Sequence, residues 1–175
     1  MHAVLPDGKK LELPAHATAK NVAEAIGPGL AKSALGAKVN GKLSDLMTEI
    51  PDGAEVSILT KKDDDALSLM RHTLAHVMAQ ATIDYFVGKG FKRADVKMGV
   101  GPVIENGFYY DFDVPESLTP EDLDNIEKRM REIVTAKLPL KKYSLPRDEA
   151  LQRYKDIGDP YKVELIQDLP EGEGL

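Results

Sequence analysis

The sequence predicts an α+β fold in two units, a small sheet with one helix followed by a unit built around a long helix. Short strand-like runs bounded by glycine-containing turns fill residues 1–60. A long helical segment follows them, and later strands and helices come in groups. A parallel α/β sheet would require strands and helices to alternate regularly, so this arrangement is not favoured.

Turn chemistry predicts the strands of the first unit. Residues 4–13 form two expected strands around Pro6-Asp7-Gly8, because proline presets φ and glycine supplies a positive φ. Asn40-Gly41 suits a type I′ turn and predicts a second hairpin over residues 37–43. A last strand is expected over residues 55–59.

One helix is expected between these hairpins. Thr18 is a suitable N-cap for residues 19–26, because its hydroxyl can accept from a free backbone amide. The apolar stripe of this helix would be Val22, Ala23 and Ile26, and Gly27-Pro28-Gly29 would end it. Two strands, a helix, a hairpin and a strand in this order predict a small β-grasp (ubiquitin-like) sheet with one helix packed on it.

The pattern changes at the charged run over residues 61–65. We therefore expect one domain at residues 1–62 and a second at residues 63–175. The second opens with a helix over residues 66–87, capped by an aspartate of the charged run, whose carboxylate also favours the positive end of the helix dipole.

The rest of the second unit mixes strands and helices. Strands over residues 97–103 and 107–114 would form a hairpin, and Thr119-Pro120-Glu121-Asp122 is typical of a helix start. Leu123, Ile126, Met130 and Ile133 follow at helical spacing. The remaining expected elements are a strand at 142–145, helices at 147–155 and 161–166, and a loop-like tail at 168–175 that we interpret as a truncation.

Composition narrows the class of protein. Hydrophobic residues make up 42% and charged residues 30%, which is typical of a globular domain. The net charge of −6 disfavours binding of nucleic acid by general phosphate attraction. We expect no membrane span, no signal peptide and a cytoplasmic location. Because the chain has no cysteine, disulfides and thiolate-bound zinc are excluded.

His72 and His76 lie four residues apart on the long helix and project from one face. An apolar stripe is expected on nearly the opposite face, formed by Leu67, Met70, Leu74, Val77 and Ala81. The histidines are therefore not expected to fill the core. Three roles stay open from spacing alone: a surface pair, a general base, or two ligands of a metal site.

The local sequence resembles two known modules in the order found in bacterial threonyl-tRNA synthetases. Residues 71–76 resemble the HxxxH helix of threonyl- and alanyl-type editing domains, and residues 101–111 resemble the glycine-proline-to-tyrosine hairpin of the same module. The segments that resemble a preceding TGS domain are residues 5–8, 27–31 and 39–41, and the later lysine segment of the editing module is matched by residues 161–166.

The resemblance implies that the second unit edits, hydrolysing seryl-tRNA(Thr) and sparing threonyl-tRNA. It implies that His72 positions or activates the attacking water and that Lys162 holds this water or stabilises the developing negative charge. His76 would shape the pocket or bind near the terminal adenosine. Tyr110 and Asn106 would contact the substrate.

The family pattern has a further segment after the lysine, with an aspartate and with a cysteine followed by a histidine. No such segment is present in this sequence. We therefore expect an incomplete editing site and no metal. In the family, ATP, magnesium and zinc belong to the ligase core, so no cofactor is expected here. The implied partners are the acceptor end of tRNA(Thr) and the rest of a homodimeric synthetase. The alternative is a regulatory or RNA-binding TGS module without catalysis.

Overall fold

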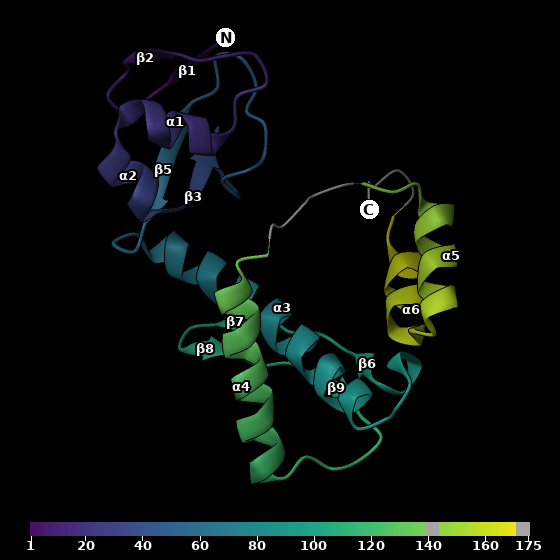
Figure 1. Ribbon diagram of the computed structural model, residues 1–175. Helices are drawn as coiled ribbons and strands as arrows, with labels where there is room; N and C mark the ends of the chain where they lie inside the picture. Colours follow the sequence, from purple (N-terminus) through teal and green to yellow (C-terminus); the bar gives the residue numbers. More distant parts are fainter. Residues whose placement is uncertain (139–143, 171–175) are drawn as a thin grey trace. The chain divides into compact units, whose positions relative to one another are not determined.

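The computed structural model describes residues 1–138 and 144–170. They fall into two compact units, Met1–Arg71 and His72–Leu175, so that the division lies within the long helix α3 (Asp64–Gly88) (Figure 1). The expected strand at residues 142–145 and the expected tail at 168–175 lie partly outside the described residues.

The first unit is a small mixed sheet with helices on it. Its strands are β1 (His2–Val4), β2 (Lys10–Glu12), β3 (Ala34–Val39), β4 (Lys42–Ser44) and β5 (Val56–Thr60). The order β4-β3-β5 is antiparallel throughout, and β1 pairs with β2. A parallel bridge between Val4 and Glu55 connects the two parts, supported by the Val4 amide bonding to the Ala54 carbonyl at 2.8 Å. This β-grasp-like arrangement confirms the fold expected for the first unit.

Helix α1 (Ala19–Ile26) packs on this sheet. Thr18 caps it as expected, and Asn21 completes a reciprocal capping box. Val22 and Ala23 are fully buried, but Ile26 is 44% exposed, because the buried residues all lie in the first two turns. Gly27 ends α1, and Pro28 then begins a second helix, α2 (Pro28–Ser33), which the sequence pattern did not predict.

The β3–β4 turn has the predicted type I′ character. Asn40 and Gly41 have φ of 48° and 78°, as the two central residues of this turn require. The Asn40 side chain also accepts a hydrogen bond from the Glu55 amide at 2.9 Å. The buried core beneath this sheet consists of Ala3, Leu13, Ala17, Ala19, Val22, Ala37, Ile50, Ala54 and Val56.

The second unit contains an interrupted hairpin instead of two continuous strands. Its paired segments are β6 (Lys97–Met98) with β9 (Phe112–Asp113) and β7 (Val103–Ile104) with β8 (Gly107–Phe108). Between them, the Gly99 amide bonds to the Asp111 carbonyl at 2.9 Å and the Asp111 amide to the Val100 carbonyl at 3.0 Å. Pro102 has no amide hydrogen to donate, which is one reason why the ladder is irregular here.

The apolar stripe expected on α3 is only partly buried, because Ala81 is buried and Val77 is half-buried but the other three residues are exposed. Leu67, Met70 and Leu74 are 48%, 49% and 40% exposed. The residues that α3 buries in the second unit are Ala75, Ala79, Ala81, Thr82 and Phe86. Because seven residues span almost two helical turns, His72 lies on the same side as Ala79 and Phe86, and not opposite the buried face.

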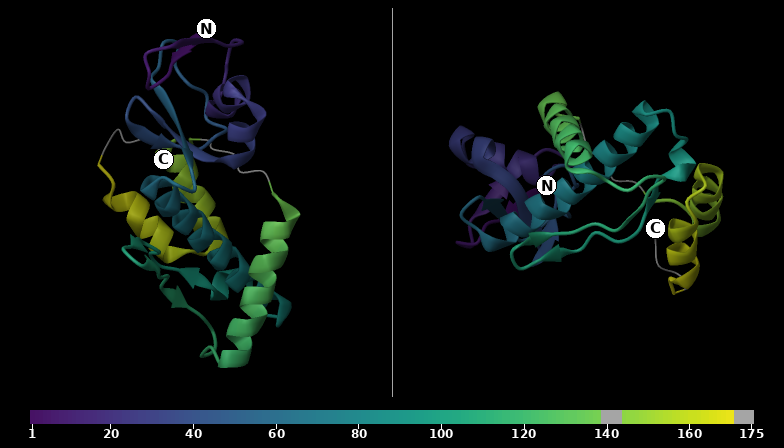
Figure 2. Two further views of the ribbon diagram at one scale, coloured as in Figure 1. Left: turned by 90° about the vertical axis from the view of Figure 1, so that its left-hand side faces the viewer. Right: turned by 90° about the horizontal axis from the view of Figure 1, so that it is seen from below.

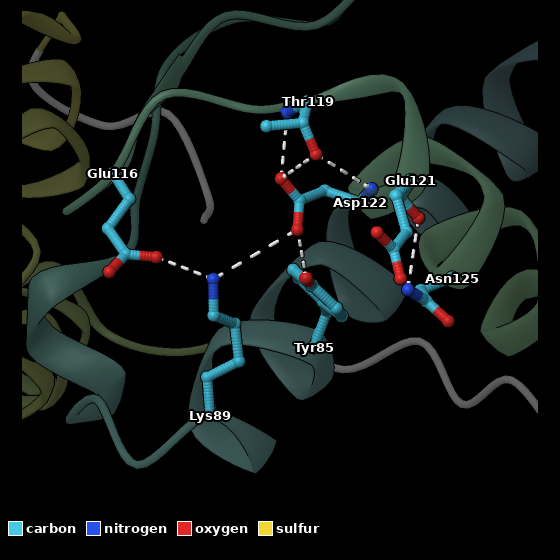
Figure 3. Close-up of polar contacts among 7 residues, drawn as sticks. All are labelled: Tyr85, Lys89, Glu116, Thr119, Glu121, Asp122 and Asn125. Atoms are coloured by element: carbon cyan, nitrogen blue, oxygen red, sulfur yellow. Dashed lines mark hydrogen bonds and ion pairs between the residues drawn. The ribbon is translucent and has the colours of Figure 1, made fainter.

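Helix α4 (Pro120–Ala136) begins where the sequence predicted and is joined to α3 by a polar network (Figure 3). Thr119 and Asp122 form a capping box, and the Tyr85 hydroxyl donates to the Asp122 carboxylate. Lys89 pairs with Glu116 at 2.5 Å. Of the stripe expected on α4, Ile126 is buried, Met130 and Ile133 are half-buried, and Leu123 is exposed.

Helices α5 (Arg147–Ile157) and α6 (Pro160–Asp168) pack side by side (Figure 2). The short helix η1 (Arg93–Asp95) precedes β6. The second core cluster contains Ala79, Phe86, Val96 and Met98, with Tyr110 and Phe112 packed against it. Within the described ranges, no helix is both long enough and apolar enough to cross a membrane.

Candidate functional site

His72 and His76 face each other on α3. Their Nε2 atoms are 3.1 Å apart, and the rings meet edge to face with centroids separated by 4.6 Å. Both side chains are exposed, although the same face of α3 is buried one and two turns further on. The pair is therefore accessible to a ligand, while the following turns of α3 are held in place by their burial in the core.

Lys162 lies in the first turn of α6, and its charge reaches His76. The pKa of His76 is lowered from 6.5, first because neighbouring atoms partly desolvate the ring although it stays accessible to solvent, then by the positive charges of His72 and Lys162. The charge of a lysine on α6 thus acts on the histidine pair of α3. A lowered pKa keeps His76 neutral at neutral pH.

Tyr110 lies in the middle of the hairpin and is half-buried. Its ring stacks on Phe112 with centroids 5.1 Å apart and an interplanar angle of 14°. A side chain at Gly101 would overlap the Tyr110 ring, so the glycine makes room for it. Burial raises the pKa of Tyr110, and the charges of Asp159 and Tyr154 raise it further, so its hydroxyl remains protonated.

Asn106 is not brought to the other predicted site residues by any polar contact. It lies in the turn between β7 and β8, with its side chain exposed. In the described part of the chain it makes no hydrogen bond to the histidine pair, Lys162 or Tyr110. The structure therefore links three of the five predicted residues, His72 and His76 by contact and Lys162 through its charge. Tyr110 is instead influenced by the charge of Asp159, the residue that caps α6.

The histidine pair has the donors and acceptors for acid–base chemistry. In a neutral imidazole one nitrogen carries a proton and the other a lone pair. If the His72 Nε2 donates to the His76 Nε2, the His72 Nδ1 keeps a lone pair and the His76 Nδ1 keeps a proton. The pair then presents one basic nitrogen and one N–H donor. Within residues 1–138 and 144–170, no group of three or more metal-ligating side chains is found.

Sequence reasoning missed Asp159 and a pocket next to α6. Asp159 is 2% exposed and caps α6, for which its place just before Pro160 was an available signal. The pocket has a volume of about 480 Å³. It is lined by Gly99, Val100, Asp111, Phe112, Asp113, Tyr161, Glu164, Leu165 and Asp168, and by none of the predicted site residues.

Comparison with known proteins connects this geometry to a family. Residues 1–60 match the model of the TGS domain. Over 175 residues the chain is 55% identical to a threonine–tRNA ligase of Thermus thermophilus, covering 100% of the chain and 26% of that relative. The chain corresponds to the N-terminal region of bacterial threonine–tRNA ligases.

Further threonine–tRNA ligases match in the same way. That of Deinococcus deserti is 53% identical over 176 residues, covering 100% of the chain and 27% of the relative. That of Halalkalibacterium halodurans is 49% identical, covering 100% of the chain and 26% of the relative. The chain thus spans about a quarter of the length of these threonine–tRNA ligases. The TGS domain accounts for the β-grasp-like first unit, and the similarity to the ligases continues through the histidine helix and α6.

Proposed function

We propose that this chain is the N-terminal part of a threonine–tRNA ligase and that its second unit hydrolyses seryl-tRNA(Thr). The observation that carries the proposal is the His72–His76 contact, with Nε2 atoms 3.1 Å apart, in a chain matching that region of the ligases. The charge of Lys162, which helps to lower the pKa of His76, supports it. The proposal includes a TGS domain at residues 1–62 and an editing domain at residues 63–175.

The need for a second site follows from the similarity of the two amino acids. Serine lacks one methyl group of threonine, and one missing methyl in a binding pocket is worth only ~1–3 kcal/mol, or ~10- to 200-fold in discrimination. A site that hydrolyses the wrong ester after synthesis supplies the remaining accuracy.

His72 acts as the general base in this proposal. Its free Nδ1 takes a proton from water as the water oxygen bonds to the ester carbonyl carbon. The ester C–O bond then breaks, the protonated His72 returns its proton to the terminal ribose oxygen of the tRNA, and serine leaves with its carboxyl group. In the tautomer that this step requires, the His72 Nε2 donates to the His76 Nε2, 3.1 Å away, which leaves the basic Nδ1 of His72 free.

Lys162 stabilises the charge that this step creates. The carbonyl oxygen becomes negative when water adds, and a fixed ammonium nearby lowers the energy of that state. The lowered pKa of His76 supports this role, because a neutral His76 does not compete with Lys162 for the anion. The remaining N–H of His76 is available to the terminal adenosine, and Tyr110 and Asn106 contact the substrate.

The partners follow from the reaction. They are the acceptor end of tRNA(Thr) and the remainder of a homodimeric synthetase, in the cytoplasm. ATP, magnesium and zinc serve the ligase reaction in the other parts of such an enzyme, so residues 1–175 alone do not aminoacylate tRNA.

Ester hydrolysis by a His72→Ala variant tests the proposal. The assay uses seryl-tRNA(Thr) with this chain and with the complete product of its gene. Because the general base is lost, we expect hydrolysis by the complete product to fall about 10²- to 10⁴-fold, with the fold intact. Unchanged hydrolysis by a folded variant would remove His72 from the mechanism.

The alternative is a regulatory or RNA-binding TGS module without catalysis. It is favoured by the family-model match, which covers residues 1–60 and stops before α3. Retained RNA binding without ester hydrolysis, by both this chain and the complete gene product, would support this alternative.

A further inference from the structure

Asp159 is the only buried charged side chain in the described part of the molecule, with 2% of its surface exposed. It stands in the short connection between α5 and α6, directly before Pro160. A buried carboxylate is costly unless it is paired or hydrogen-bonded. Its partners therefore indicate what it does.

One carboxylate oxygen of Asp159 holds the first turn of α6. Oδ1 accepts a hydrogen bond from the Lys162 backbone amide at 3.1 Å, as an N-cap does for the third residue of a helix. Lys162 is also the residue whose ammonium group is proposed to stabilise the negative charge during hydrolysis. The bond therefore holds the backbone of Lys162 in the first turn of α6.

The other oxygen faces η1. Oδ2 lies 4.0 Å from Arg93 Nη2, and Arg93 Nη1 donates to the Val96 carbonyl at 2.6 Å. Next to Asp159, Gly158 has φ of 77°, and a side chain on it would come within 3.0 Å of the Ala94 Cβ. The connection between α5 and α6 therefore packs closely against η1.

Asp159 also influences Tyr110, which lies in the hairpin. Its negative charge is the second cause, after burial, of the raised pKa of Tyr110. Asp159 thus influences the Tyr110 hydroxyl through its charge and bonds to the backbone of Lys162.

We propose that Asp159 is a positioning residue: by capping α6 next to η1, it sets the backbone from which the Lys162 side chain acts on the histidine pair. The role of Lys162 in hydrolysis rests on the proposed function. The effect of Asp159 on the position of Lys162 is independent of that function. A measurement that reports the placement without any turnover can therefore separate the two.

The titration of His76, followed by NMR in the full chain, gives this measurement. The charged groups that act on His76 are His72 and Lys162. Lys162→Met removes the charge and should raise the His76 midpoint towards 6.5. Asp159→Ala should raise it in the same direction by releasing the first turn of α6. Asp159→Asn should leave it near the wild-type value, because asparagine caps a helix about as well as aspartate.

Thr119→Ala is the matched control. It removes the N-cap of α4 in the same unit and should lower the thermal midpoint comparably without moving the His76 midpoint. If Asp159→Ala does not fold, Asp159→Gly replaces it, because glycine is a tolerated N-cap residue that still lacks the side-chain hydrogen bond.

An unmoved His76 midpoint in the folded Asp159→Ala or Asp159→Gly variant overturns the proposal, and so does an unmoved midpoint in Lys162→Met. In the complete gene product we further expect Asp159→Ala to lower kcat more than it raises KM. The separate variant Asp159→Asn should keep kcat near the wild-type value. If the midpoints shift as expected but no protein hydrolyses the ester, the proposed function fails and the positioning role stands.

Discussion

The Tyr85 hydroxyl donates a hydrogen bond to the Asp122 carboxylate and thereby joins the C-terminal half of α3 to the first turn of α4 (Figure 3). The same carboxylate accepts from the backbone amide and hydroxyl of Thr119, both at 2.7 Å. One side chain thus completes the start of α4 and connects it to the helix that carries the histidines.

Acid should weaken this connection. The hydrogen bonds from the Thr119 side chain, from Tyr85 and from the Thr119 amide lower the pKa of Asp122 from 3.8 to about 2. Because the folded-state pKa is the lower one, the contribution of Asp122 to stability is complete above 3.8 and is lost as pH falls towards about 2. Thermal midpoints measured across this pH range should decline in the wild type and decline less steeply in Asp122→Asn. Asp124→Asn on the same helix is the control, and equal slopes for wild type and Asp122→Asn would contradict the assignment.

Gly101→Ala should destabilise the second unit. The new methyl group would overlap the Tyr110 ring, which is held by its stack on Phe112. Overpacking of this kind costs about 1–3 kcal/mol. Gly107→Ala is the matched control in the same hairpin, because no atom beyond its chain neighbours lies within 4 Å of the position that the new methyl group would take. Denaturant unfolding measures both, and equal stability of the two variants would show that the ring moves freely.

Asn40→Ala should destabilise the TGS domain. It removes the bond to the Glu55 amide and places alanine at a φ of 48°, a left-handed conformation that costs roughly 1–2 kcal/mol without asparagine or glycine. Asn40→Gly keeps the conformation and loses only the hydrogen bond, so it should be the less destabilised variant. The reverse order in thermal unfolding would exclude backbone strain as the cause.

His76 should titrate below 6.5, and His72→Ala should raise its midpoint only part of the way back. Burial is the largest cause of the lowered pKa and remains in the variant, whereas the repulsion from His72 is removed. NMR titration of the ring protons measures both midpoints. A wild-type midpoint at or above 6.5 would exclude the crowded, positively charged surroundings of His76.

Features with a local physical cause could be predicted from the sequence. Asn40-Gly41 specifies its turn through φ, and Thr18 and Thr119 specify helix starts through their hydroxyl groups. Pro28 illustrates the limit of such signals. Its place after Gly27 predicts the end of one helix, but proline at the first helical position also begins the next one.

Features that depend on packing could not be predicted. Apolar residues lie on several sides of α3, and the face that is buried in the second unit is set by small side chains such as Ala75 and Ala79, with Leu74 left 40% exposed. The spacing of His72 and His76 was sufficient to place them together. Their relation to Lys162 depends on how α6 packs on β6 and α5, and no single segment encodes that packing.

Hydrolysis of seryl-tRNA(Thr), compared with threonyl-tRNA(Thr) under single-turnover conditions, tests the central claim most directly. The complete gene product should release serine from its tRNA, should spare the threonyl ester, and should lose this activity in His72→Ala and Lys162→Met. Equal rates for both esters, or a serine release that persists in both folded variants, would contradict an editing site at this histidine pair.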